Sequence, residues 1–322
     1  MSVSRRDFLG YCAACAGVLG LDALGLTRLE AALAANGAPT IIWLHGSGCQ
    51  GDSVSFLNRI DGSAPAGQQT VDDILVNTVN LAYHTVVMSS AGEQAVAALL
   101  QAKRAGGYVL VLEGAVPRAF GGRACTVWTH NGVETTYQEA IADLAAGAAA
   151  VVCVGTCASF GGIAHAGSND TDVITGGEAA GRPVINIPGC PAHPDWIAWA
   201  VVQLVLGNPV ELDSFNRPTA LYGEEVHANC PRRLGAPTHV GFATTFGQDH
   251  LCLLNLGCRG PMAFADCPSR KRNNGVNWCV DANAMCFACV QPDFPGGSFY
   301  TDPAAAAAVD GVSAATPTAP AA

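Results

Sequence analysis

Short apolar runs alternate with longer amphipathic stretches over the first two thirds of the chain. Runs rich in Val, Ile and Leu with few charges predict strands that are buried on both faces of a parallel sheet. The predicted strands are residues 40–45, 108–113, 149–154 and 183–187. Helices are expected near residues 91–105, 137–146 and 194–206. This alternation predicts an α/β fold, a doubly wound parallel sheet with helices on both faces.

The two ends of the chain depart from this pattern. Arg5 and Arg6 precede a short apolar run and then the small-residue stretch 32–34, which is the layout of a twin-arginine export signal. We therefore predict a signal peptide over residues 1–34. No apolar run reaches the ~20 residues that cross a membrane, so no membrane span is expected. Residues 302–322 are Ala/Pro-rich without periodicity and predict a disordered tail.

Composition narrows the class of protein further. The 322 residues suffice for two domains, and half of them are apolar. A formal net charge of −10 argues against nucleic acid as a partner. The 14 cysteines exceed what a core uses, and Cys12 and Cys15 leave with the signal. Because the twin-arginine route exports folded, loaded proteins, metal clusters are favoured over disulfides for the remaining cysteines.

Each of the four predicted strands ends beside a reactive side chain. The first runs into Cys49 and Asp52, the second ends at Glu113, and the third and fourth run into Cys157 and Cys190. The carboxyl ends of parallel strands line one crevice of a doubly wound sheet. We therefore expect three thiols and a carboxylate to converge there.

The same segment also matches a different motif. GSGCQG (46–51) fits the dinucleotide-binding fingerprint, which requires an acidic residue about 20 positions later at the end of a second strand. Asp72 and Asp73 come late and precede the strand-like run 74–79. A cysteine has no role in holding pyrophosphate, so this interpretation is disfavoured.

A second cysteine-rich region begins near Leu221. Its ligand-type residues sort by proximity into two sets of four: His227, Cys230, Cys252 and Cys258, and Cys267, Cys279, Cys286 and Cys289. Either set is compatible with zinc or with a [4Fe–4S] cluster, and the wide separations within the second set favour iron–sulfur. Three such sites form an electron wire. The chain has no further set of residues for substrate chemistry, which places catalysis in another subunit.

The chain resembles the small, iron–sulfur subunit of [NiFe] hydrogenases over nearly its whole mature length. The motifs that carry the resemblance are WLHGSGC (43–49), LEG (112–114), GTCASFGG (155–162), PGCPAHP (188–194), HANCPRR (227–233), CLLNLGCRGP (252–261), ADCP (265–268), NNGVNWC (273–279) and CFACVQPDF (286–294). The signal sequence SRRDFLG matches as well.

The resemblance implies a flavodoxin-like domain over residues 35–220, followed by a smaller, mostly irregular or helical iron–sulfur domain over residues 221–301. It implies a periplasmic hydrogenase that is active only with a large subunit, whose nickel–iron centre splits H2. A cytochrome or another redox protein would accept the electrons, and a dimer of heterodimers stays open. The alternative function is a stand-alone iron–sulfur carrier or an H2-sensing module, and the export signal disfavours a sensor.

Motif matching also assigns the cluster ligands. The proximal cluster, nearest the nickel–iron centre, takes Cys49, Cys157 and Cys190; the medial cluster takes Cys267, Cys286 and Cys289; the distal cluster takes His227, Cys230, Cys252 and Cys258. Glu113 would lie near the subunit interface, where a proton relay and a structural carboxylate are both open interpretations.

Two positions depart from the common family pattern. Asp52 stands where the family usually has a cysteine, and we expect it to be the fourth proximal ligand rather than an N-cap of the following helix. This resembles some oxygen-insensitive members, so oxygen tolerance is a hypothesis; the extra cysteines of other tolerant relatives fall at Gly51 and Gly162 here. Cys279 replaces a common proline and predicts a medial [4Fe–4S] cluster, giving three such clusters in all.

Two further cysteines lie outside these sets. Cys153 falls in the middle of a predicted strand and is expected in the core. Cys125 lies in a predicted loop after Glu113, and a position near the first cluster is one hypothesis for it.

Overall fold

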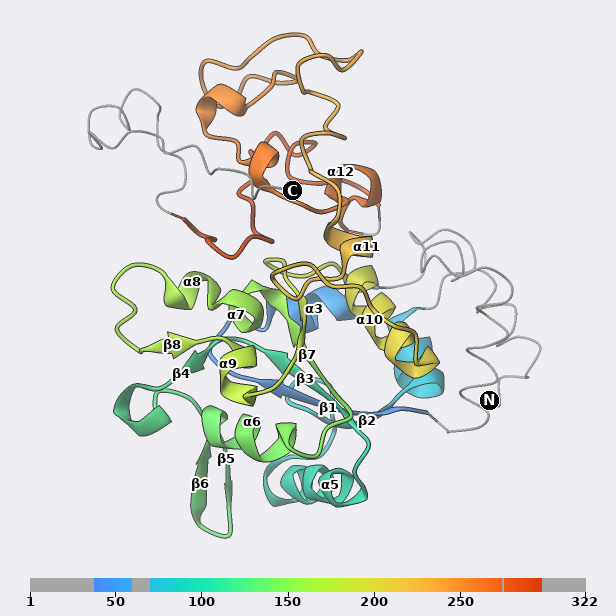
Figure 1. The fold of residues 1–322 in the computed structure, drawn as a ribbon, viewed down its shortest axis with the longest axis vertical. Coiled ribbons are helices and arrows are strands. Elements are labelled where there is room, and N and C mark those ends of the chain that lie inside the picture. The colour runs from blue at the N-terminus through green and yellow to red at the C-terminus, as the bar shows by residue number, and fades with distance from the viewer. Residues whose placement is uncertain (1–37, 60–69, 274, 297–322) are drawn as a thin grey trace, which may run out of the picture.

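The computed structural model of the chain describes residues 38–59, 70–273 and 275–296. The predicted signal peptide (1–34) and tail (302–322) lie outside the described residues. A lower α/β part contains the sheet, and an upper part made mostly of loops follows it in the chain (Figure 1).

The central sheet has five parallel strands, in the order β2-β1-β3-β7-β9. They are β1 (Thr40–His45), β2 (Asn80–His84), β3 (Val109–Glu113), β7 (Ala150–Val154) and β9 (Ile185–Ile187). This is the flavodoxin-like strand order. His45 pairs with Glu113, Glu113 with Val154, and Val154 with Ile187, so these strands end together at one edge of the sheet.

Helices cover both faces of this sheet, which explains why every residue of β3 is buried. On one face, Leu110 and Leu112 belong to a core cluster with residues of α5 (Gly92–Ala105) and α6 (Tyr137–Ala145). On the other face, Val111 packs with residues of α3 (Gly51–Leu57) and α10 (Pro194–Leu206). The shorter helical elements of this part are α4 (Val71–Asp73), η1 (Ile74–Thr78), η2 (Ala119–Gly122), α7 (Gly155–Phe160), α8 (Gly162–His165) and α9 (Gly176–Ala180). Two antiparallel strand pairs lie outside the central sheet: β4 (Val116–Pro117) pairs with β8 (Val173–Ile174), and β5 (Thr126–His130) pairs with β6 (Val133–Thr136).

The predicted α/β class is confirmed, but one predicted element is wrong. Residues 74–79 are not a strand: η1 is a π-helical turn, and the second strand is Asn80–His84. A short apolar run carries no period that separates a strand from a buried helical turn. The real strand was missed because it lies at the edge of the sheet and contains polar, partly exposed residues.

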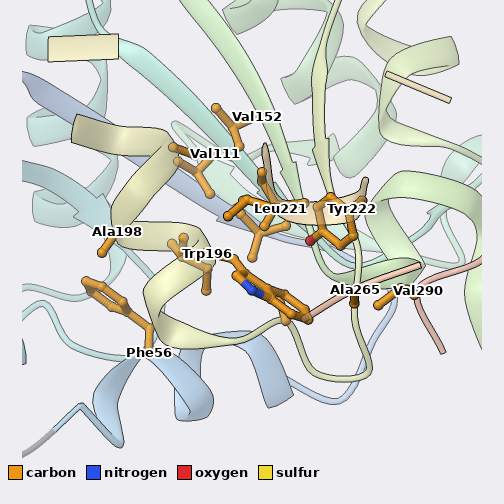
Figure 2. Packing of buried hydrophobic residues seen from close by; sticks show 14 of the residues in the cluster. Phe56, Val111, Val152, Trp196, Ala198, Leu221, Tyr222, Ala265 and Val290 are labelled. Atoms are coloured by element: carbon orange, nitrogen blue, oxygen red, sulfur yellow. The ribbon is translucent and has the colours of Figure 1, made fainter. Parts of the chain in front are cut away.

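The second part of the chain contains only short helical elements in its described residues: α11 (Thr219–Tyr222), η3 (Leu254–Leu256), η4 (Gly260–Met262) and α12 (Cys267–Arg270). A common core joins it to the sheet, because Val111 and Val152 share a cluster with Ala265 and Val290 (Figure 2). Fully buried Trp196 donates from Nε1 to Asp266 Oδ1 at 3.0 Å across this junction. Within the described ranges, no helix is both long and apolar enough to cross a membrane.

Candidate metal centres

The three predicted proximal thiols lie near one another at the carboxyl edge of the sheet. Cys49 follows β1, Cys157 lies in α7 directly after β7, and Cys190 follows β9. Two glycines pack against these thiols: a Cβ on Gly51 would lie 3.0 Å from Cys49 Sγ, and one on Gly162 would lie 2.9 Å from Cys157 Sγ. The three cysteines come to one edge because their parallel strands do.

Asp52 lies close to these thiols as well. It is inside helix α3, whose N-cap is Gln50, so the N-cap alternative is wrong. Only 8% of Asp52 is exposed, and its Oδ1 accepts a hydrogen bond from the backbone N–H of Ala192 at 2.7 Å. Burial raises the pKa of the Asp52 carboxyl to about 7, and the negative charge of Glu113 adds to this. The carboxylate is therefore poorly compensated by the protein alone.

Glu113 holds the start of helix α3. Its Oε1 accepts from the backbone N–H groups of Asp52 and Ser53, both at 3.0 Å. Its Oε2 accepts from Trp43 Nε1 at 2.9 Å and from the Ser53 hydroxyl. Four donors on one buried carboxylate fix its position, so the geometry favours the structural interpretation over a proton relay.

The proximal thiols influence one another electrostatically. Burial raises the pKa of Cys157 to about 11, with Asp52 and Cys49 adding to the shift. Cys190 keeps an exposed surface, yet the atoms around its thiol exclude enough water to raise its pKa to about 12, and Cys289 and Cys157 add to this. Such thiols stay protonated unless a cation stabilises the thiolates, which is what a bound metal cluster does.

The medial set surrounds a cavity. All four of its members, Cys267, Cys279, Cys286 and Cys289, line a space of about 360 Å³, together with Cys190. Burial raises the pKa of Cys267 to about 12 and that of Cys286 further above its usual value. This space far exceeds the ~10–15 Å³ that one water needs, so it suits a multi-atom group bound by four sulfurs.

The distal set comes together around Gly260. A Cβ on Gly260 would lie 3.7 Å from both Cys258 Sγ and His227 Cβ. Burial raises the pKa of Cys230, and the neighbouring thiols of Cys258 and Cys252 raise it as well. All four predicted distal residues therefore lie in one neighbourhood.

The ligand-type residues suit clusters better than single ions. In a [4Fe–4S] cluster the ligands bind different irons, so they surround a volume rather than a point. The thiol-lined medial cavity has this form, whereas structural zinc takes four ligands at one centre.

The structure also bears on the dinucleotide-binding motif and on the two cysteines outside the ligand sets. β2 ends at His84 and Asp72 lies in α4, so the acidic residue of a dinucleotide site is missing from that strand end. Cys153 is fully buried in β7, as expected of a core residue. Cys125 packs against the apolar cluster between the sheet and helices α5 and α6.

The sequence analysis did not single out Arg272, which lines the medial cavity. The available signal was the run of basic residues 270–272.

Comparison with known proteins decides the family. The C-terminal profile of the NiFe/NiFeSe hydrogenase small subunit matches residues 222–300, and the profile of the NADH ubiquinone oxidoreductase 20 Kd subunit matches residues 49–204. The periplasmic [NiFeSe] hydrogenase small subunit of Desulfomicrobium baculatum is 39% identical over 93% of this chain and 99% of that protein. The chain belongs to the NiFe/NiFeSe hydrogenase small subunits.

Solved structures of hydrogenase small subunits share the fold. A chain of the Desulfomicrobium baculatum [NiFeSe] hydrogenase matches with a TM-score of 0.73 and 38% identity, covering 82% of this chain and 99% of that one. The actinobacterial-type NiFe-hydrogenase of Ralstonia eutropha H16 matches with a TM-score of 0.69 and 30% identity, covering 80% and 79%. The predicted family, the flavodoxin-like domain with a smaller domain, and the assignment to a hydrogenase are thereby confirmed.

Proposed function

We propose that this hydrogenase small subunit relays electrons from H2 oxidation, at a nickel–iron centre in its large subunit, to an external acceptor. Three iron–sulfur clusters, when bound, would supply the one-electron carriers. The observation that carries the proposal is that the medial ligand set adjoins both the proximal and the distal set. Cys190 of the proximal set lines the medial cavity, and Cys286 of the medial set donates its backbone N–H to Cys258 Sγ of the distal set at 3.4 Å.

We assign twelve residues to these clusters. Asp52 joins Cys49, Cys157 and Cys190 at the proximal site; Cys267, Cys279, Cys286 and Cys289 hold the medial cluster; His227, Cys230, Cys252 and Cys258 hold the distal one. A neutral histidine in place of an anionic thiolate raises a cluster's reduction potential, which suits the last carrier before the acceptor.

The carboxylate of Asp52 is the distinctive part of the proximal set. Its burial and its place beside Cys157 and Cys190 support ligation through oxygen. On this basis we propose that the enzyme tolerates oxygen. H2 uptake that collapses irreversibly in air would contradict that part of the proposal.

Cys279 gives the medial cluster its fourth thiolate. Its side chain lines the same cavity as the other three medial cysteines. Cys279→Pro removes that sulfur, and the expected result is a three-iron EPR signal in the purified complex. An unchanged spectrum would show that Cys279 is not a ligand.

We place the complex in the periplasm, because relatives such as that of Desulfomicrobium baculatum are named periplasmic and the N-terminus has the layout of a twin-arginine signal. A cytochrome or another redox protein would take the electrons. A single heterodimer and a dimer of heterodimers are the two candidate assemblies, and the mass of the complex in solution distinguishes them.

The deciding experiment measures nickel and iron in the complex that co-purifies anaerobically with this chain. Three four-iron clusters and one iron beside nickel give roughly 13 Fe per Ni. Near-stoichiometric nickel with that iron content is the expected result. Iron without nickel would instead identify an electron carrier that works with another partner, and the absence of both metals would refute the proposal.

A further inference from the structure

Arg272 is a cation placed between two ligand sets. It lines the medial cavity together with Cys190, Cys267, Cys279 and Cys289. It also lines a second cavity, of about 620 Å³, beside Gly51 at the start of helix α3. One guanidinium therefore borders both the medial thiols and the helix that carries Asp52.

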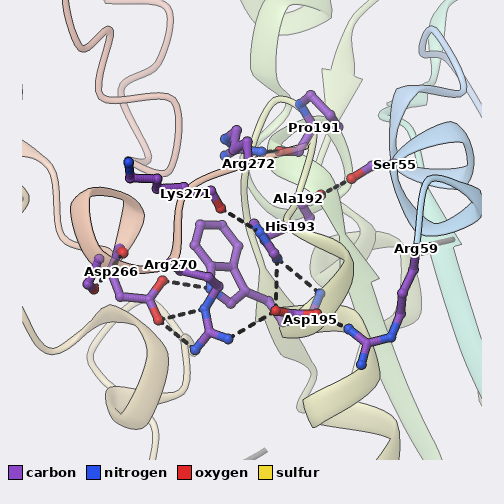
Figure 3. Close-up of polar contacts among 12 residues, drawn as sticks. Ser55, Arg59, Pro191, Ala192, His193, Asp195, Asp266, Arg270, Lys271 and Arg272 are labelled. Atoms are coloured by element: carbon purple, nitrogen blue, oxygen red, sulfur yellow. Dashed lines mark hydrogen bonds and ion pairs between the residues drawn. The ribbon is translucent and has the colours of Figure 1, made fainter. Parts of the chain in front are cut away.

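The position of this side chain is fixed by two contacts. Nη1 donates to the backbone oxygen of Pro191 at 2.7 Å, directly after Cys190 (Figure 3). The guanidinium carbon lies 5.5 Å from the centre of the Trp196 ring, within the range of a cation–π contact. Its charge is therefore held against the loop that carries a proximal thiol.

None of the ion pairs in the part of the chain that the structure describes includes Arg272, although its charge lowers the pKa of the nearby Asp52 carboxyl. Its neighbour Arg270 is different, because it pairs with both Asp195 and Asp266. Burial opposes the charge on Arg272, yet Cys289, Cys267 and Cys279 raise its pKa above the usual value. A desolvated cation needs compensating negative charge, which the medial thiolates would supply once a cluster binds them.

We propose that Arg272 is the electrostatic counterion of the medial cluster and, more weakly, of the proximal one, and that it raises their reduction potentials. This inference rests on the proposed function, since it requires clusters at these sites. A fixed positive charge stabilises the reduced, more negative state of a neighbouring cluster. The distal cluster serves as an internal reference, because its Cys258 adjoins the medial set at Cys286, whereas Arg272 is held against the loop that follows Cys190.

The test is redox titration of the purified heterodimer, followed by EPR, for wild type, Arg272→Gln and Arg272→Lys. Gln keeps a donor for the Pro191 oxygen without the charge, whereas Lys keeps the charge. At a fixed potential, we expect Arg272→Gln to lower the ratio of reduced to oxidised medial cluster at least tenfold. This corresponds to a drop of about 59 mV in the reduction potential for one electron. Arg272→Lys should retain most of the wild-type potential, and the distal potential should not move.

The matched control is a substitution of the neighbouring Arg270. Arg270→Gln removes a neighbouring arginine whose charge is already paired, and it should leave the medial potential unchanged. Equal potentials in Arg272→Gln and wild type, equal shifts in the Gln and Lys variants, or loss of medial iron in both would overturn the inference in favour of a purely structural role. Absence of cluster signals in the wild type would instead refute the proposed function.

Discussion

At the scale of single residues, the packing around Asp52 requires a glycine at position 155. Gly155 has a φ of +82°, and a Cβ there would lie 2.0 Å from Asp52 Oδ2. Both the backbone conformation and the space therefore require glycine. The carboxylate of Asp52 rests directly against the first residue of α7, two positions before Cys157.

Gly155→Ala is expected to displace Asp52 and to empty the proximal site. We predict a loss of about four iron atoms per heterodimer from a total of roughly 13, with the medial and distal EPR signals retained. Iron analysis with EPR measures both effects.

Gly181→Ala is the matched control for this substitution. Gly181 has a similar φ of +60°, but nothing lies within 4 Å of where its Cβ would be. Alanine at this position adds only the backbone strain, of order ~1 kcal/mol, without a steric clash. Full iron content in Gly155→Ala, or equal iron loss in both variants, would refute the role assigned to this contact.

At the scale of elements, helix α3 begins without a side-chain cap of its own. Its N-cap, Gln50, makes no capping hydrogen bond and has a φ of 59°. The carboxylate of Glu113, at the end of β3, accepts from the N–H groups of Asp52 and Ser53 instead. A strand end thus supplies the acceptor that a capping residue normally provides.

Glu113→Gln should loosen this helix start. The amide has one acceptor oxygen in place of two, so buried donors among Trp43, Ser53 and Asp52 lose their partner, at about 1–3 kcal/mol for each unsatisfied group. We expect faster hydrogen exchange at the Asp52 and Ser53 amides and a lower Tm.

The capping box of α6 provides the comparison for this variant. Thr136→Ala removes an ordinary cap and should cost about 1 kcal/mol without changing exchange in α3. If Glu113→Gln leaves the α3 amides unchanged and lowers only H2 turnover, the proton-relay interpretation is correct instead.

At the scale of the whole molecule, a polar junction ties the two parts of the chain together (Figure 3). Partly buried Asp195, near the start of α10, pairs with Arg59 from the first part and with Arg270 from the second. His193 accepts from the Asp195 N–H at Nδ1 and donates from Nε2 to the Lys271 carbonyl at 2.7 Å. The ring is therefore neutral, with its proton on Nε2.

This junction predicts a loss of stability in mild acid. Burial, with the charges of Arg272 and Arg270 adding, lowers the pKa of His193 to about 3, whereas the unfolded value is ~6.5. Because the folded pKa is the lower one, the stabilisation is complete above a pH of ~6.5 and is lost as the pH falls below it. Between about pH 6.5 and pH 5 the loss is about 2 kcal/mol.

His193→Asn is the variant that isolates this effect. Asparagine keeps a capping acceptor and does not titrate in this range, so the pH dependence of the free energy of unfolding should become shallower. His84, whose pKa burial also lowers, to about 4, contributes a slope of the same sign and is unchanged in this variant. Urea unfolding of the complex at pH 7 and pH 5 measures it, and an unchanged slope would contradict the assignment.

The sequence predicted the sheet well because its strands are apolar runs of a length typical of buried parallel strands. It also brought Cys49, Cys157 and Cys190 to one edge, since that follows from strand direction alone. It missed β2, whose partly exposed, polar residues leave no apolar run. It also missed Arg272 and the hydrogen bonds to Glu113, because contacts between residues far apart in the chain depend on packing that no local pattern encodes.

The return of the C-terminal segment to the sheet has a consequence for biosynthesis. The Thr156 hydroxyl donates to the carbonyl of Cys289, 133 residues later, and Arg217 donates to the carbonyl of Val290. A ribosome that has released only the sheet has therefore made neither the last medial thiol nor the segment that closes over α7. Iron delivery to the medial site must therefore wait until Cys289 has been synthesised, well after the whole sheet and the three proximal cysteines.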